Sequence, residues 1–172
     1  MATVSKITLH GVDNTGFNVG ETVGNGQRNR TDTGDVLVVQ IMLHLIAHSD
    51  AATPSPSRVG LVSWCEVPEP TGNWDAKTGQ AILSYQRLFR SQLLAVDGVI
   101  HPASYSLASG CQRNIAWGPT RAATPQNSSF MTITHLHKIL LMSMYGTFYH
   151  STYVPDVLRK FPKLGPMLRI DI

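Results

Sequence analysis

The chain has 172 residues, of which 42% are hydrophobic and 15% are charged, with a formal net charge of +3. This length and composition predict one globular domain, or one domain with an extended end. No apolar stretch approaches the roughly 18 residues of a membrane span, and the first residues, MATVSKITLHGVDNTG, lack the apolar core of a signal peptide. We therefore expect no membrane span. The expected location is the cytoplasm, or the periplasm or exterior reached by a route that reads no signal peptide.

The charge is unevenly distributed along the sequence. From Arg113 onward there are seven Lys or Arg residues and two acidic residues, so the preceding part is slightly acidic. A basic end can contact an acidic partner, or it can simply be a solvated face. Lys and Arg are nowhere interleaved with aromatic residues in a run, so nucleic-acid binding is not predicted.

The first predicted elements are a strand, a loop and a helix. Residues 4–10 alternate in polarity, which predicts an edge strand, and the glycine-rich residues 11–34 predict an extended loop. Thr33 or Asp35 is then expected to cap a helix that continues to about Ile46. Its residues are apolar on nearly all sides, so this helix should be central and buried.

A long connection and a second helix follow. Four prolines between residues 49 and 72 forbid a continuous helix there, although Val59–Val67 fits a short strand. Asp75 is expected to cap a helix that reaches about Leu94. The pair Asp97-Gly98 predicts a tight turn.

The last third predicts a loop and more helix. Residues 109–129 are typical of a loop, a helix is expected over Thr132–Tyr145 with Gly146 as its stop, and a short helix over Pro155–Phe161 precedes a basic, proline-broken tail. No internal repeat is evident in the sequence. The prediction is a mainly α fold with short strands and long loops, divided into an arm (1–31), a helical core (32–112) and a C-terminal helical extension (113–172).

Three segments of the predicted core share a pattern with a known family. They are DVLVVQIML (35–43), GNWDAKTGQAILSYQ (72–86) and DGVIHP (97–102). In this order they resemble the peptidoglycan-binding domain family found beside bacterial cell-wall hydrolases. The resemblance covers about residues 32–108. This chain departs from the family in its longer connection between the two helices and in having His101 where the family has glycine.

The matched residues also have plain structural roles. Gly72 permits a sharp turn, and Trp74 can pack against the helix that Asp75 caps. Gln40 and Gln86 are expected to place amides where helices meet loops, satisfying backbone groups there.

The resemblance implies a non-catalytic binding module whose ligand is bacterial cell-wall peptidoglycan. The expected contact residues surround the second helix and the following turn: Trp74, Tyr85, Gln86, Arg87, Asp97 and Gly98. One alternative is a protein–protein adaptor, a structural component of a bacterial envelope or secretion machine whose partner is another bacterial protein. A second alternative is a cell-wall hydrolase or a metal-dependent enzyme.

Residues capable of catalysis or metal binding form no recognised motif. His44 and His48 have a spacing that can hold zinc, but no Glu follows His44 as in the metalloprotease signature, and both also fit the less buried edge of a helix. Cys65 and Cys111 lack metal-site spacing, and the sequence leaves open whether they are free thiols or a disulfide. We predict no catalytic residues, no metal and no cofactor.

Overall fold

The computed structural model describes residues 1–9, 12–24, 32–48, 67–90, 96–102, 132–147 and 150–171. The predicted strand over Val59–Val67 lies outside these ranges except for its last residue, and so do Cys65 and Cys111. More of the described residues are in helices than in strands, so the fold is mixed and rich in helix. The elements are β1 (Ala2–Leu9), β2 (Val12–Asn18), β3 (Val23–Gly24), α1 (Thr33–Ala47), α3 (Ala76–Leu88), β4 (Val99–Ile100), α5 (Thr132–Tyr145), α6 (Tyr153–Lys160), the 3-10 helix η1 (Pro162–Met167) and β5 (Leu168–Asp171).

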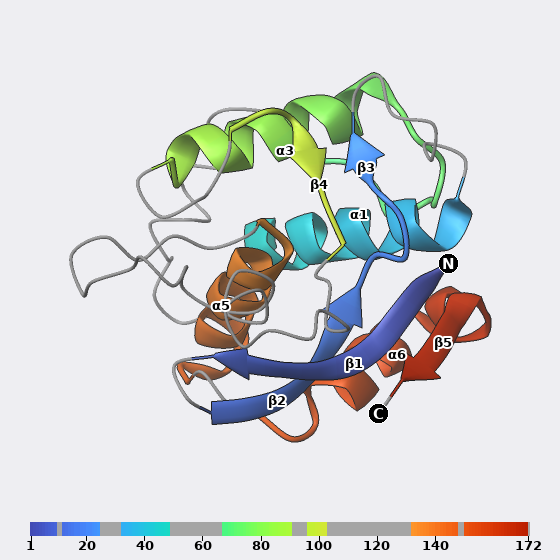
Figure 1. Cartoon of the computed structure of the whole chain (residues 1–172), viewed down its shortest axis with the longest axis vertical. Helices are drawn as coiled ribbons and strands as arrows, with labels where there is room; N and C mark the ends of the chain where they lie inside the picture. The colour runs from blue at the N-terminus through green and yellow to red at the C-terminus, as the bar shows by residue number, and fades with distance from the viewer. Residues whose placement is uncertain are drawn as a thin grey trace, which may run out of the picture.

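Helix α1 is central, as predicted. It contacts α3 and α5 as well as strands β1, β2 and β3. Figure 1 shows it crossing the middle of the molecule between α3 and the larger sheet. Nearly all of its side chains are buried, which explains why its apolar residues surround the helix rather than forming one stripe.

The N-cap of α1 differs from the prediction. The cap is Asp32, whose Oδ1 accepts the backbone N–H of Asp35 at 3.0 Å, so the expectation of Thr33 or Asp35 is wrong. Asp35 lies in the first turn with a fully buried side chain. Its carboxylate accepts the N–H groups of Gly20 and Glu21 at 2.8 and 3.0 Å, and burial raises its pKa. Asp35 therefore joins the N-terminal segment to α1.

The larger sheet joins the two ends of the described chain. Its strand order is β2-β1-β5, with β1 antiparallel to β2 and parallel to β5. The prediction of β1 as an edge strand is wrong, because β5 pairs with it on the other side. The predicted loop over residues 11–34 is also wrong in part, since it contains β2 and β3. The partner of β1 on this side, β5, lies at the other end of the chain, and a local sequence pattern cannot show such a pairing.

The remaining helices lie close to their predicted positions. Asp75 caps α3, as predicted, but the helix ends at Leu88 rather than near Leu94. Helix α5 has the predicted bounds, and Gly146 after it has the positive φ of 68° typical of a helix stop. Helix α6 begins two residues before Pro155, because the first turn of a helix tolerates proline.

One hydrophobic cluster includes residues of all three predicted parts of the chain, from Ala2 through α1 and α3 to Leu164. The predicted arm, helical core and extension therefore share a core. Among the described helices, none combines the length and the apolar character needed to cross a membrane.

Two histidines of α5 are buried within this core. His135 Nδ1 lies 2.7 Å from the hydroxyl of Tyr85, and His137 Nε2 lies 2.6 Å from the carbonyl oxygen of Phe17. Burial lowers the pKa of His135 to about 3 and that of His137 to about 4. Both imidazoles are therefore neutral in the folded protein at neutral pH, and His137 is oriented to donate its Nε2–H to the strand β2 carbonyl.

These pKa values predict loss of stability in mild acid. Between about pH 6.5 and 4 the unfolded chain takes up protons at both histidines while the folded chain does not, so acidification favours unfolding. Each histidine contributes up to about 1.4 kcal/mol per pH unit in the lower part of this range. Urea unfolding at a series of pH values should show a shallower acid decline for His135→Gln and for His137→Gln than for the wild type. His48→Gln, at an exposed position, controls for the loss of an imidazole. If neither core substitution changed how the free energy of unfolding falls with pH, the lowered pKa values of His135 and His137 would be contradicted.

Candidate functional site

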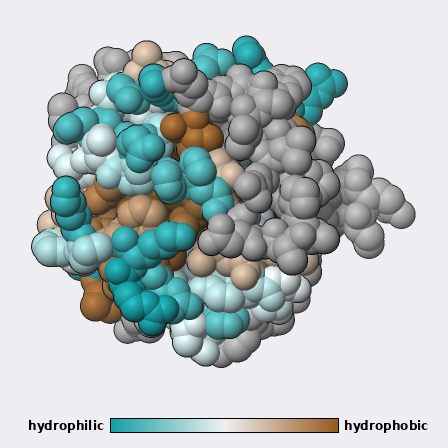
Figure 2. Space-filling model, turned by 180° about the vertical axis from the view of Figure 1, so that it is seen from behind, coloured by the Kyte–Doolittle hydropathy of each residue, from teal (hydrophilic) through white to brown (hydrophobic). Residues whose placement is uncertain are grey.

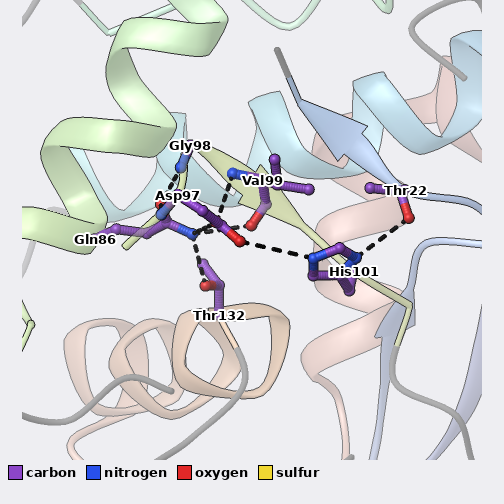
Figure 3. A network of polar contacts seen from close by, with 7 residues as sticks. All are labelled: Thr22, Gln86, Asp97, Gly98, Val99, His101 and Thr132. Carbon is purple, nitrogen blue, oxygen red and sulfur yellow. Dashed lines mark hydrogen bonds and ion pairs between the residues drawn. The ribbon is translucent and has the colours of Figure 1, made fainter. Parts of the chain in front are cut away.

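The turn after α3 is held by the side chain of Gln86 (Figure 3). Its Oε1 accepts the backbone N–H groups of Asp97 and Gly98 at 3.1 and 2.7 Å. Its Nε2 donates to the carbonyl oxygen of Val99 at 2.9 Å and to Thr132 Oγ1 at 3.0 Å, with Asp97 Oδ1 at 3.3 Å. One buried amide thus joins α3, the turn, β4 and the start of α5.

Gln40 makes the same kind of contacts one helix earlier. Its Oε1 accepts the N–H groups of Thr71 and Gly72 at 3.0 and 2.8 Å. Its Nε2 donates to the carbonyl oxygen of Asn73 and to Thr78 Oγ1, both at 2.9 Å. The hydroxyl of Thr78 in turn donates to Asp75 Oδ1 at 2.6 Å, so this amide is connected to the cap of α3.

We call these two arrangements the glutamine clamps. In each, a helix provides a glutamine that accepts two consecutive N–H groups, the second from a glycine of positive φ (80° at Gly72, 75° at Gly98). Each glutamine then donates to the carbonyl of the residue after that glycine and to a threonine hydroxyl in the next helix of the described residues. The structure therefore contains the same contact pattern between a helix and a glycine turn twice, although no internal repeat is expected from the sequence. The sequence signal that could have revealed it is a glutamine on the apolar side of a helix, followed later in the chain by a polar residue and glycine, Thr71-Gly72 or Asp97-Gly98.

The clamps fix the backbone of both turns. Gly72 also lies so close to α1 that an added Cβ would be 2.6 Å from Thr33 Cγ2, so the position needs glycine for space as well as for its positive φ. Because the two glutamines are fully buried and the turn N–H groups bond to them, losing either amide would leave buried donors unsatisfied. The predicted role of Gln40 and Gln86 in satisfying backbone groups is confirmed.

Two of the six predicted contact residues cannot touch a ligand at the surface. Tyr85 and Gln86 have no exposed surface. The Tyr85 ring packs against Phe89 and His135, and burial raises the pKa of its hydroxyl well above the usual value. Their assignment as contact residues is corrected. Both side chains face inward: the Tyr85 ring packs in the core, and the Gln86 amide bonds to the turn.

The other four candidates occupy opposite ends of α3. Trp74 is half-buried and packs against the core just before the helix, while Arg87 is exposed in its last turn. Asp97 is exposed in the turn beyond, and Gly98 is buried. At 1.5 Å per residue, Trp74 and Arg87 are separated by roughly 20 Å along the helix axis. Trp74, Arg87 and Asp97 therefore border an elongated face rather than converging on one pocket. Gly98 is buried in the turn, so its assignment as a contact residue is corrected as well.

The exposed face of α3 is cationic and polar. Lys77, Gln80 and Arg87 are exposed on it, and Arg90 is exposed just beyond its end. No Asp or Glu occurs from Ala76 to Arg90. A surface of this kind favours anionic groups, and its guanidinium groups match carboxylates in geometry.

His101, which stands where the resembling family has glycine, adds a contact near this face. Its Nε2 lies 3.7 Å from Asp97 Oδ2 and its Nδ1 lies 3.3 Å from Thr22 Oγ1 (Figure 3). A hydroxyl, an imidazole and a carboxylate are thus aligned. The imidazole is half exposed, and the N–H groups of Gly98 and Val99 already bond to Gln86 and Asp97. A catalytic triad of this kind would need free backbone N–H groups nearby to bind an oxyanion, and these two N–H groups are already bonded. The contacts of His101 instead connect the turn at Asp97 to Thr22, just before β3.

The zinc-compatible pair does not form a larger cluster in the described residues. The rings of His44 and His48 stack with centroids 4.3 Å apart, and His48 Nδ1 bonds to the His44 carbonyl at 3.0 Å. Over the described parts of the chain, no three His, Cys, Asp or Glu side chains gather in a way that could hold a metal ion.

Comparison of the chain with protein-family models, with curated proteins and with solved structures gives no match. The resemblance to peptidoglycan-binding domains therefore rests on the sequence pattern alone.

The clamp geometry predicts a large effect of Gln86→Ala on stability. Removing the amide leaves the N–H of Gly98 and the carbonyl of Val99 without their partner, which should cost about 3 kcal/mol or more. Gln80→Ala removes an exposed glutamine from the same helix and should change stability by less than about 0.5 kcal/mol. Urea unfolding of the two variants measures the difference, and equal small losses would show that the Gln86 bonds contribute little.

Proposed function

We propose that the protein is a non-catalytic module that binds bacterial cell-wall peptidoglycan along the exposed face of α3. Three segments of the chain carry the pattern of peptidoglycan-binding domains, and they occupy α1, α3 and the two clamped turns. Within these segments, Gln40 and Gln86 are buried and bond to the two turns, and Tyr85 is buried in the core. Exposed Arg87, which directly follows the second segment, and exposed Asp97 of the third segment lie with half-buried Trp74 along one elongated face.

The observation that carries the proposal is the charge of this face. Peptidoglycan is an extended polymer whose peptide stems carry carboxylates. Helix α3 offers exposed cations and no acid over a length suited to an extended ligand, with a partly exposed tryptophan at one end. Arginine can bind a carboxylate through two parallel hydrogen bonds, and an indole can pack on the apolar face of a sugar.

Fixed turns at both ends of α3 would favour binding. A ligand that meets a preorganised surface loses less free energy in ordering the protein. The buried hydrogen bonds of the two glutamine clamps already hold both turns in place, so ligand binding does not have to order them.

Arg87→Ala should weaken co-sedimentation of the full chain with purified sacculi by about tenfold, because loss of an exposed charge-assisted bond removes roughly 1.4 kcal/mol of binding. The thermal midpoint should stay within a few degrees of the wild type, since the side chain is exposed. Lys163→Ala, which removes a positive charge from η1, is the matched control and should pellet like the wild type. Equal pelleting of all three proteins would remove the proposed site, and no pelleting of the wild type beyond a basic control protein would remove the function.

A second candidate function is a protein–protein adaptor. The observation that favours it is the edge of the larger sheet at β5, which lies away from α3 and exposes an apolar side chain.

A further inference from the structure

Two imidazoles lie side by side at the C-terminal end of α1. His44 is in the last turn of the helix and His48 is its C-cap, so the two residues are four apart and on the same side of the helix. Their rings stack with centroids 4.3 Å apart and with planes inclined by 29°. His48 is exposed and His44 is half-buried, so the pair lies at the surface.

Each ring donates one N–H group to a backbone carbonyl. His48 Nδ1 lies 3.0 Å from the carbonyl oxygen of His44, and since this oxygen can only accept, Nδ1 carries the proton. The His44 ring bonds to the backbone of Pro68, which has no N–H, so it also donates to a carbonyl. Among the described residues His44 Nδ1 has no partner, so Nε2 is this donor. In the neutral rings, the lone pairs are therefore on His48 Nε2 and His44 Nδ1.

This arrangement is typical of histidines that bind metals. A ligating imidazole normally donates its other ring N–H to a carbonyl or a carboxylate, which fixes the tautomer and makes the ligating nitrogen more basic. Burial, followed by repulsion from His48, lowers the pKa of His44, so its ring is neutral at pH 7. His44 Nδ1 is also a buried polar atom that lacks the bond such atoms usually make, and a bound ion would supply it.

The His44 ring is held in place more firmly than the His48 ring. Phe161, the C-cap of α6, contacts His44 edge to face with ring centroids 6.1 Å apart, and Pro68 accepts its N–H. In Figure 1, α6 lies behind the larger sheet, and Figure 2 shows this reverse side, where apolar side chains are exposed between hydrophilic ones. His48 is exposed, so its ring can rotate while His44 stays fixed.

The charges around the pair have opposite effects on a cation. The C-terminal end of a helix carries a partial negative charge, which favours a cation there. Of the charged side chains that act on His44, Glu69 stabilises positive charge and Lys160 opposes it, and both are exposed. The two side chains therefore offset each other, and the helix end is left as an attractive contribution.

We propose that His44 and His48 bind a divalent transition-metal ion, such as Zn²⁺ or Ni²⁺, through His44 Nδ1 and His48 Nε2. Imidazole suits these ions and binds Zn²⁺ at about 2.0–2.1 Å. A lone pair lies in the plane of its ring, so the His48 ring turns off the stack to point at the same ion. No third His, Cys, Asp or Glu of the described residues completes the set, so water fills the remaining positions. The result is a surface site that is open to a further ligand.

Calorimetric titration of the full chain with Ni²⁺ tests the site. We expect His44→Gln and His48→Gln each to lower the affinity by about tenfold or more, because one imidazole alone cannot chelate. His101→Gln removes an exposed imidazole elsewhere and is the matched control, which should bind like the wild type. Loss in His48→Gln but not in His44→Gln would show binding to a single surface histidine. That result, unchanged affinity in both variants, or no binding by the wild type would overturn the proposal.

Two charge variants give a result that misfolding cannot imitate. Lys160→Gln should tighten Ni²⁺ binding and Glu69→Gln should weaken it, each by about two- to threefold, because interactions between exposed charges are small. Paramagnetic Ni²⁺ should broaden the amide signals of the last turn of α1, and broadening centred elsewhere would contradict the assignment. Thermal melts in EDTA check that each variant folds. Arg87→Ala should bind Ni²⁺ like the wild type, so this site and the cell-wall proposal can fail separately.

Discussion

A buried amide that satisfies the backbone of a turn is the constraint on which this structure depends. Gln40 of the central helix α1 and Gln86 of α3 each bind two successive N–H groups and a carbonyl of a turn that follows. Gly72, Gly98 and Val99 are buried, so water cannot readily replace a partner lost by their backbone groups. The amides therefore decide where α3 begins and where the chain turns into β4, and the glycines of positive φ allow the turns to close on them.

The exposed face of α3 and the β5 edge of the larger sheet differ in how they relate to this frame. The face of α3 has a clamp at each end, and its exposed cations are held by a helix whose inner side chains are fully packed. The β5 edge belongs to a sheet formed by the first and last described strands, and it is connected to the frame through α1 and η1. A change at one surface should therefore leave the other intact.

Much of the helical frame could be predicted from sequence because its signals are local. The apolar residues of α1, the cap at Asp75, the bounds of α5 and the stop at Gly146 all depend on neighbours within a few residues. The sheet could not, since β1 is paired by a strand more than 160 residues away in sequence. In the candidate site, the sequence predicted that Gln86 would satisfy backbone groups, but it also placed Tyr85 and Gln86 among the ligand contacts, which their burial contradicts. Both side chains are buried, whereas Arg87, the next residue in sequence, is exposed.

Amide hydrogen exchange at Gly72 and Gly98 tests the central claim most directly. Both N–H groups lie in connections, where exchange is ordinarily fast, but each is bonded to a fully buried glutamine. If the clamps hold the frame, both amides should exchange as slowly as the core amides of α1, opening only with global unfolding. Exchange at the rate of exposed turn amides would show that the turns open independently, and the clamps would then not be the constraint that orders the fold.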